Sequence, residues 1–124
     1  MAEIKFTGSK LLKTIGKEFT SKFPYLYLRW CGKDGKALNW DVTHASIRAK
    51  KAAAELSTNG SMHVGTFEKR YEDAYGVKIE VMYIKNGRKY RSLVEDDKTS
   101  LTAYNKKVAD AGASKVMDEM ASSF

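Results

Sequence analysis

The chain contains one cysteine, Cys31, and two histidines, His44 and His63, the residue types from which a nucleophile and its general base are built. A cysteine reacts as its thiolate, so it needs a base close by. No spacing in the sequence brings either histidine to Cys31, and the strand pattern around Cys31 is typical of a packed side chain. His63 falls in the first turn of a predicted helix, where the helix dipole disfavours a cation. We therefore expect no catalytic residue and no enzyme.

Acidic residues occur together at Glu72-Asp73, Glu95-Asp96-Asp97 and Asp118-Glu119, where paired carboxylates could do acid–base work or hold a divalent cation. The first pair lies on the polar side of a predicted helix, and the second group precedes a helix start, where negative charge is stabilised. None has a supporting ligand pattern, and the glycines form no phosphate-binding loop. The sequence thus predicts no metal site and no cofactor.

Basic residues are the strongest chemical signal in the sequence. Lys and Arg number 22 against 15 Asp and Glu, which gives a net charge of +7 and a pI near 9.4. A cationic β-ribbon with aromatic neighbours can follow phosphates and stack bases, so backbone-directed nucleic-acid binding is one hypothesis. The other interpretation is a solvated surface whose cations protect hairpin edges from unwanted pairing. The candidate cations at the two predicted hairpins are Lys33, Lys36, Lys85, Arg88, Lys89 and Arg91.

Aromatic residues crowd the first predicted hairpin, at Tyr25, Tyr27, Trp30 and Trp40. If one face of the sheet is uncovered, these side chains form an exposed apolar patch of the kind that marks an interface. Our first hypothesis is therefore a small non-enzymatic binding or scaffold protein that acts through protein contacts and forms a homodimer. Nucleic-acid binding through the basic hairpins is the alternative.

A repeated pattern indicates the elements that position these residues. Shifting the sequence by 52 residues places Leu12, Ile15, Phe19 and Phe23 on Val64, Phe67, Tyr71 and Tyr75, with helical spacing in both copies. Ser9 and Ser61 stand where an N-cap is expected, and Pro24 and Gly76 end the two helices.

A strand and a tight turn follow each predicted helix. The strands cover 25–31 and 77–84, and Asp34-Gly35 and Asn86-Gly87 are turn sequences with positive φ. Return strands are predicted at Leu38, Trp40 and Val42 and at Tyr90, Ser92 and Val94. In the first strand, either the tyrosine face or the Leu28 and Trp30 face can be the buried one. Helices are predicted at 46–56 and 100–120, the second interrupted at Gly112.

These elements predict an α+β fold: a duplicated α-β-β-α unit whose hairpins form a four-stranded antiparallel sheet packed with helices. We expect a single domain over 1–124, made of repeats at about 8–58 and 60–120. The N-terminus lacks the apolar core of a secretory signal, and the apolar runs are too short to cross a bilayer. With one cysteine as well, the sequence predicts a cytoplasmic protein without membrane contact.

Three segments resemble a family of small, uncharacterised bacterial proteins. They are 61–71 with 75–79, Phe19 to Leu28, and Asp96 to Leu101 with Asn105. The resemblance implies a bacterial α+β protein with a duplicated helix-strand-strand unit, and it transfers no function. The family has a tryptophan-bearing last strand, whereas this chain has Lys89-Tyr90-Arg91-Ser92 there.

Overall fold

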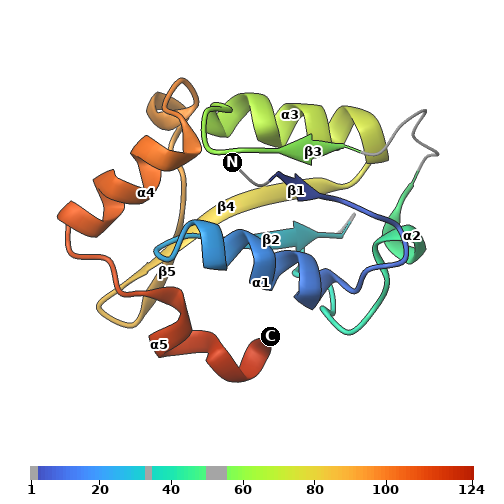
Figure 1. The fold of residues 1–124 in the computed structure, drawn as a ribbon, viewed down its shortest axis with the longest axis horizontal. Helices are drawn as coiled ribbons and strands as arrows, with labels where there is room; N and C mark the ends of the chain where they lie inside the picture. Colours follow the sequence, from blue (N-terminus) through green and yellow to red (C-terminus); the bar gives the residue numbers. More distant parts are fainter. Residues whose placement is uncertain (1–2, 33–34, 50–55) are drawn as a thin grey trace.

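The computed structural model describes residues 3–32, 35–49 and 56–124 (Figure 1). The helices are α1 (Leu12–Lys22), α2 (His44–Ile47), α3 (Val64–Tyr75), α4 (Leu101–Asp110) and α5 (Val116–Met120), with short 3-10 turns η1 (Val94–Asp96) and η2 (Ala121–Ser123). The strands are β1 (Ile4–Lys5), β2 (Tyr27–Cys31), β3 (Ser57–Thr58), β4 (Lys78–Lys85) and β5 (Arg88–Arg91). The α+β class is confirmed. Within this part of the chain, no helix is both long and apolar enough to span a membrane.

The strands form two antiparallel sheets, one with the order β2-β4-β5 and a small one that pairs β1 with β3. The predicted four-stranded sheet is therefore wrong. The second hairpin is present as β4 and β5, but the described residues 35–49 contain no return strand. Ala37 makes an isolated bridge to Cys31, and the Leu38 N–H donates to the carbonyl of Trp30 at 2.9 Å. The α-β-β-α order is thus present in the second half alone, and the duplication stays a prediction.

The missing return strand has a physical cause at the start of α1. The N-cap of α1 is Leu11, which has no side chain that could accept a hydrogen bond, so the first helical N–H groups need other acceptors. They donate to the loop after β2: Leu12 N–H to the carbonyl of Val42 at 2.9 Å, and Lys13 N–H to that of Trp40 at 3.0 Å. The loop carbonyls are used at the helix end and not in a sheet. The predicted capping by Ser9 is wrong, because the N-cap of α1 is Leu11 and no side chain caps the helix.

The N-terminus of α3 is held in a closely similar way. Its N-cap, His63, makes no side-chain capping bond, and Val64 and Gly65 donate to the carbonyls of Thr99 and Asp97 before α4. Ser61, two residues earlier, bonds to Asn59 instead of capping the helix. The N-terminus of α1 is therefore held by the loop that leads into α2, and the N-terminus of α3 by the segment that leads into α4.

The main core lies between one face of the larger sheet and helices α1 and α3. The apolar helix positions expected from the sequence are all buried: Leu12, Ile15, Phe19, Phe23, Val64, Phe67, Tyr71 and Tyr75. Leu28 and Trp30 of β2 point into this core. Gly112, with φ of 100°, separates α4 from α5 as predicted, whereas α2 ends at Ile47 and the rest of the predicted 46–56 helix falls largely outside the described residues.

The opposite face of the sheet, which we call the outer face, has a second and smaller core. Tyr27 of β2 and Met82 and Ile84 of β4 are buried there against Val116 of α5. Both faces of β2 are therefore covered near its start. The sequence left open which face is buried, and the structure buries the Leu28 and Trp30 face in the main core and Tyr27 under α5.

Candidate functional site: the outer sheet face and the β4–β5 hairpin

The far end of the outer face, beyond α5, carries charged side chains. Because side chains alternate along a strand, the pairs Arg29↔Glu80 and Cys31↔Lys78 share this face, and Arg91 of β5 joins them opposite Met82. These residues line a cavity of about 750 Å³ between the sheet and the segments around Gly35 and Ile47. The topology thus brings charges from three strands to one opening.

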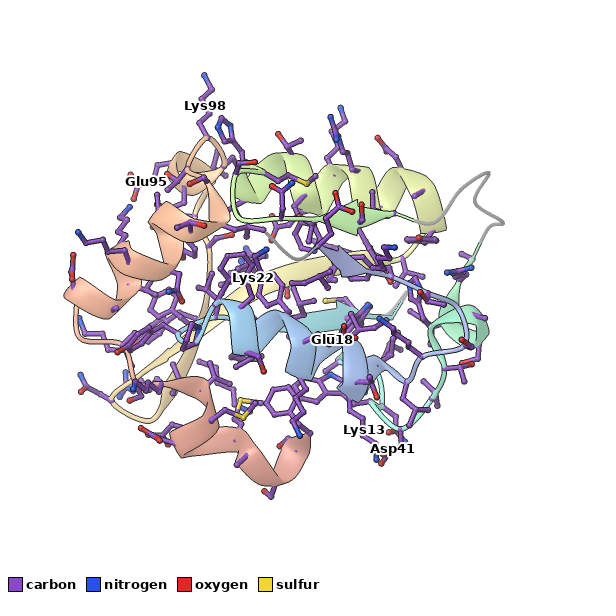
Figure 2. The ribbon with its side chains drawn as sticks, in the orientation of Figure 1. Lys13, Glu18, Lys22, Asp41, Glu95 and Lys98 are labelled. Carbon is purple, nitrogen blue, oxygen red and sulfur yellow. The ribbon has the colours of Figure 1, made fainter. Side chains whose placement is uncertain are left out.

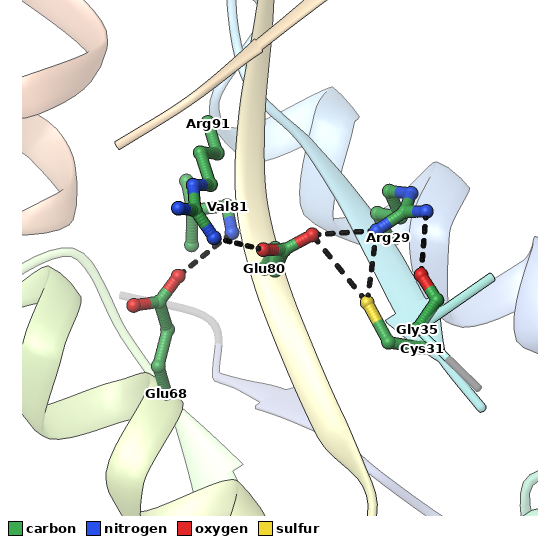
Figure 3. A network of polar contacts seen from close by, with 7 residues as sticks. All are labelled: Arg29, Cys31, Gly35, Glu68, Glu80, Val81 and Arg91. Atoms are coloured by element: carbon green, nitrogen blue, oxygen red, sulfur yellow. Dashed lines mark hydrogen bonds and ion pairs between the residues drawn. The ribbon is translucent and has the colours of Figure 1, made fainter. Parts of the chain in front are cut away.

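Glu80 is the centre of a hydrogen-bonded network on this face (Figure 3). Its Oε1 accepts from Arg29 Nη1 at 2.7 Å and its Oε2 from Arg91 Nη1 at 3.2 Å. Arg29 Nη2 also donates to the carbonyl of Gly35 at 3.1 Å, which ties the loop to the sheet. Burial alone raises the pKa of Glu80, but the hydrogen bonds from Arg29 and Arg91 outweigh it, and the pKa lies below its ordinary value. The carboxylate is therefore ionised at neutral pH.

Cys31 belongs to the same network and has no histidine among its hydrogen-bond partners. Its Sγ lies 3.0 Å from Arg29 Nη1 and donates to Glu80 Oε1 at 3.4 Å. Burial, followed by the charge of Glu80, raises the pKa of the thiol. His44 is buried in the main core, where Nε2 lies 2.7 Å from the Tyr71 hydroxyl. This arrangement does not activate Cys31 as a thiolate nucleophile.

Glu68 of α3 lies at the edge of β4 beside the network (Figure 3). The β5 ladder ends at Arg91, and the Val81 N–H donates to Glu68 Oε2 at 2.9 Å. Burial raises the pKa of Glu68 to about 7, partly offset by this hydrogen bond and reinforced by the charge of Asp97. The carboxyl lines a second cavity of about 410 Å³ that also holds Leu93 and Arg91.

Replacing Glu68 by glutamine is expected to remove a pH-dependent loss of stability. The pKa of Glu68 in the folded protein is raised above its ordinary value of 4.5, so the folded state favours the protonated carboxyl. The contribution of this group to the stability of the wild type is therefore present at low pH and is lost as the pH rises towards 7 and the carboxyl ionises. The variant keeps an oxygen for Val81 N–H. We expect it to be more stable than the wild type by about 1–2 kcal/mol at pH 8, after allowing for solvent screening, and not at pH 4.5.

Urea unfolding across this pH range tests the expectation. The exposed Glu72→Gln substitution on the same helix is the matched control and should give no such difference. A Glu68→Gln profile parallel to that of the wild type would contradict the assignment.

The β4–β5 hairpin carries four of the candidate cations, of which Arg88, Lys89 and Arg91 are exposed and Lys85 is half-buried. Asn86 and Gly87 both have positive φ, 54° and 75°, so the two-residue turn expected from the Asn-Gly sequence is confirmed. Lys85, Arg88 and Lys89 form no ion pair with any described residue. In contrast, two cations of the first half are paired: Lys13 with Asp41 at 2.7 Å (Figure 2) and Lys10 with Glu18 at 2.9 Å.

The exposed large apolar side chains lie in the same part of the molecule. Across residues 3–32, 35–49 and 56–124, only Tyr90, Leu93 and Val94 are large apolar residues with substantial exposure, at 39%, 59% and 86%. Tyr90 stacks on Tyr83 with ring centroids 5.3 Å apart. We call residues 88–94 the hairpin segment; it combines three cations with these three apolar side chains.

The other predicted binding residues lie elsewhere. Tyr27 and Trp30 are buried, Tyr25 is half-buried, and Trp40 packs against Tyr27, Trp30 and Phe124, so the first hairpin region has no exposed aromatic patch. Lys36 is exposed, and Lys33 lies outside the described residues. The apolar surface that we expected on the first hairpin lies on the second.

Sequence reasoning missed the network around Glu80. The signal was available, because Glu80 and Arg29 are charged residues inside strands that are otherwise apolar, and such groups are buried only with partners.

No family model, no curated protein and no solved structure matches this chain. The described residues contain no cluster of three or more His, Cys, Asp or Glu side chains that could hold a metal ion.

Proposed function

We propose that this protein is a non-enzymatic binding protein, that its contact surface is the hairpin segment, and that its partner is another protein. The observation that carries the proposal is the location of Tyr90, Leu93 and Val94, the exposed large apolar side chains of the described residues, within five positions of one another. Burying such side chains on association is favourable, by about 25 cal/mol for each Å² of apolar surface.

The composition of the segment supports a protein partner. Tyr and Arg are enriched at protein interfaces, and a core of apolar side chains with a polar rim is the usual interface anatomy. β5 is also an edge strand, and in a two-residue hairpin the N–H and C=O groups of Lys89 and Arg91 point away from β4. An extended partner segment with acidic and apolar residues would match both the edge and the charge.

Nucleic acid is the second candidate. It is favoured by Lys85, Arg88 and Lys89, which form no ion pair with the residues that the structure describes and lie near the exposed ring of Tyr90 in the sequence. Cations of this kind contact phosphates without reading sequence, and the ring offers a stacking surface. We also propose a cytoplasmic location, which is compatible with a protein partner and with a nucleic-acid partner.

Substitution of the apolar side chains is expected to weaken capture of the protein partner strongly. The Leu93→Ser/Val94→Ser variant should retain the partner at least about tenfold less than the wild type in affinity capture from nuclease-treated extract, quantified by mass spectrometry. The same loss in sedimentation velocity would identify a second copy of the chain as the partner.

The matched control is Lys106→Ser/Lys115→Ser, which changes two exposed side chains away from the segment. It should retain the partner as the wild type does. Equal recovery of every protein by wild type and Leu93→Ser/Val94→Ser would refute the proposed surface.

Fluorescence anisotropy with labelled single- and double-stranded DNA and RNA tests the second candidate. Backbone-directed binding weakens by orders of magnitude between roughly 50 and 200 mM salt, and Arg88→Ser/Lys89→Ser should reduce the slope by about 2. Absence of binding at both salt concentrations would exclude it.

The internal duplication is also proposed, and matching backbone hydrogen bonds support it. Ala45 donates to Gly8 and His44 to Lys10 in the first half; in the second, Thr102 donates to Gly60 and Leu101 to Met62. The acceptors are 52 positions apart in the two halves, which is the offset of the sequence repeat.

A further inference from the structure

We propose that the 750 Å³ cavity on the outer face binds a small organic anion, a carboxylate with an apolar body. The volume lies within the range of about 300–1,000 Å³ found for ligand pockets. Of the hairpin segment, only Arg91 lines the cavity. Tyr90, Leu93 and Val94, the apolar side chains that carry the proposed partner surface, do not line it, so the two sites can be tested separately.

Two cations in the cavity have hydrogen-bonding capacity to spare. The Lys78 side chain forms no ion pair or hydrogen bond within the described part of the chain. Arg91 uses one guanidinium nitrogen for Glu80, and its side chain is 66% exposed, so the rest of its fork is available. Arg29, in contrast, already bonds to Glu80, Cys31 and Gly35. Lys78 and Arg91 are therefore the groups that would receive a carboxylate.

The charge balance of the lining selects a monoanion. Among the lining residues that the structure describes, Arg29, Lys78 and Arg91 contribute three positive charges, and Glu72 and Glu80 contribute two negative charges, which leaves one positive charge. A carboxylate neutralises it, whereas a dianionic phosphate would bring excess negative charge close to Glu80. Glu80 also fixes the position of both arginines (Figure 3), so the site is preorganised.

The apolar part of the lining gives the ligand its second feature. Leu38, Ile47 and Val77 line the same cavity as the cations, and Gly35 and Gly76 present backbone without side chains. Apolar lining with a few convergent polar groups is the usual composition of a small-molecule site.

Three probes with the same eight-carbon chain test the proposal: octanoate, octylammonium and octanol. In a ¹⁵N NMR titration of the full chain, octanoate should shift the amides of Leu38, Gly76 and Lys78 in a saturable curve. Its affinity should be at least about tenfold higher than that of the other two probes.

Variants of the receiving groups give the second readout. Lys78→Gln and Arg91→Gln should each weaken octanoate binding by about tenfold. Lys89→Gln removes an equivalent cation from the same face of β5 and does not line the cavity, so its affinity should match that of the wild type. The NMR spectrum of each variant shows directly whether it is folded.

Equal affinity for the three probes, shifts confined to residues outside the cavity, or unchanged binding by Lys78→Gln would each overturn the proposal. The Leu93→Ser/Val94→Ser variant should bind octanoate normally. Failure of the partner experiment and failure of this one are therefore distinguishable.

Discussion

Replacement of Trp30 by alanine is expected to lower the free energy of unfolding by about 3–5 kcal/mol. The side chain is fully buried in the main core, and its ring meets Trp40 edge-on with centroids 6.4 Å apart. Its removal leaves a cavity enclosed by the sheet and α1, and it also removes a hydrogen bond. Urea unfolding followed by circular dichroism measures the effect without relying on the altered tryptophan.

The hydrogen bond of Trp30 belongs to a buried chain of polar groups. Nε1 donates to the Tyr71 hydroxyl at 2.9 Å, and this hydroxyl lies 2.7 Å from Nε2 of His44, whose Nδ1 lies 2.9 Å from the carbonyl of Phe6. Arg48 Nη2 donates to the same Phe6 carbonyl at 2.9 Å and lies 3.0 Å from Nδ1 of His44. Since arginine can only donate, Nδ1 accepts from Arg48 when the imidazole proton is on Nε2, and donates to Phe6 when the proton is on Nδ1.

Tyr71→Phe separates packing from hydrogen bonding, because it keeps the ring and leaves Trp30 Nε1 and His44 Nε2 without their partner. We expect a loss of about 1–3 kcal/mol. Tyr90→Phe is the same chemical change at an exposed position and should cost less than about 0.5 kcal/mol. A Tyr71→Phe variant as stable as the wild type would show that the chain contributes nothing to stability.

The second large effect is expected at Gly65, in the first turn of α3. A β-carbon at this position would lie 2.5 Å from Asp97 Cβ and 3.1 Å from Asp97 Cα, and the Gly65 N–H already donates to the Asp97 carbonyl. Gly65→Ala must therefore separate the start of α3 from the chain before α4. We expect a loss of about 2–3 kcal/mol in urea unfolding.

Gly16→Ala is the comparison within α1. There the new methyl would meet the flexible ring edge of Phe124 at 3.3 Å, and alanine is the better helix former, so stability should change little or rise. Asp97→Gly removes the clashing β-carbon and should recover part of the loss in the double variant. A Gly65→Ala variant with the same free energy of unfolding as the wild type would show that the contact with Asp97 does not exclude a side chain at position 65.

The local features of the fold were predictable from residue type and spacing. The helical spacing of Leu12 to Phe23 and of Val64 to Tyr75 placed eight side chains in the core, and Asn86-Gly87 fixed the second turn. These features depend on a few neighbouring residues. The return strand expected at 38–42 was wrong, because the conformation of this segment depends on a distant element. The carbonyls of Trp40 and Val42 accept hydrogen bonds from the start of α1, which no side chain caps.

The same distinction applies to the candidate sites. The cations of the second hairpin were found in the sequence, because an exposed turn keeps them at the surface. The aromatic residues of the first hairpin were misjudged as an exposed patch, because α5, more than 80 residues later, covers Tyr27. The network of Arg29, Glu80 and Arg91 requires the register of three strands, which single-strand patterns do not supply.

The pairing of β2 with β4 has a consequence for how the chain folds. Tyr27 lies opposite Met82 and Cys31 opposite Lys78, so the central ladder joins segments about 50 residues apart in sequence. Bringing these segments together costs conformational entropy before the hydrogen bonds of the ladder can stabilise the chain. Topologies rich in such non-local pairs fold on millisecond-to-second timescales rather than in microseconds. During that interval β4, a strand with buried Ile79, Val81 and Ile84, is without its neighbour, and the charges of β5 then serve as its protection against intermolecular pairing.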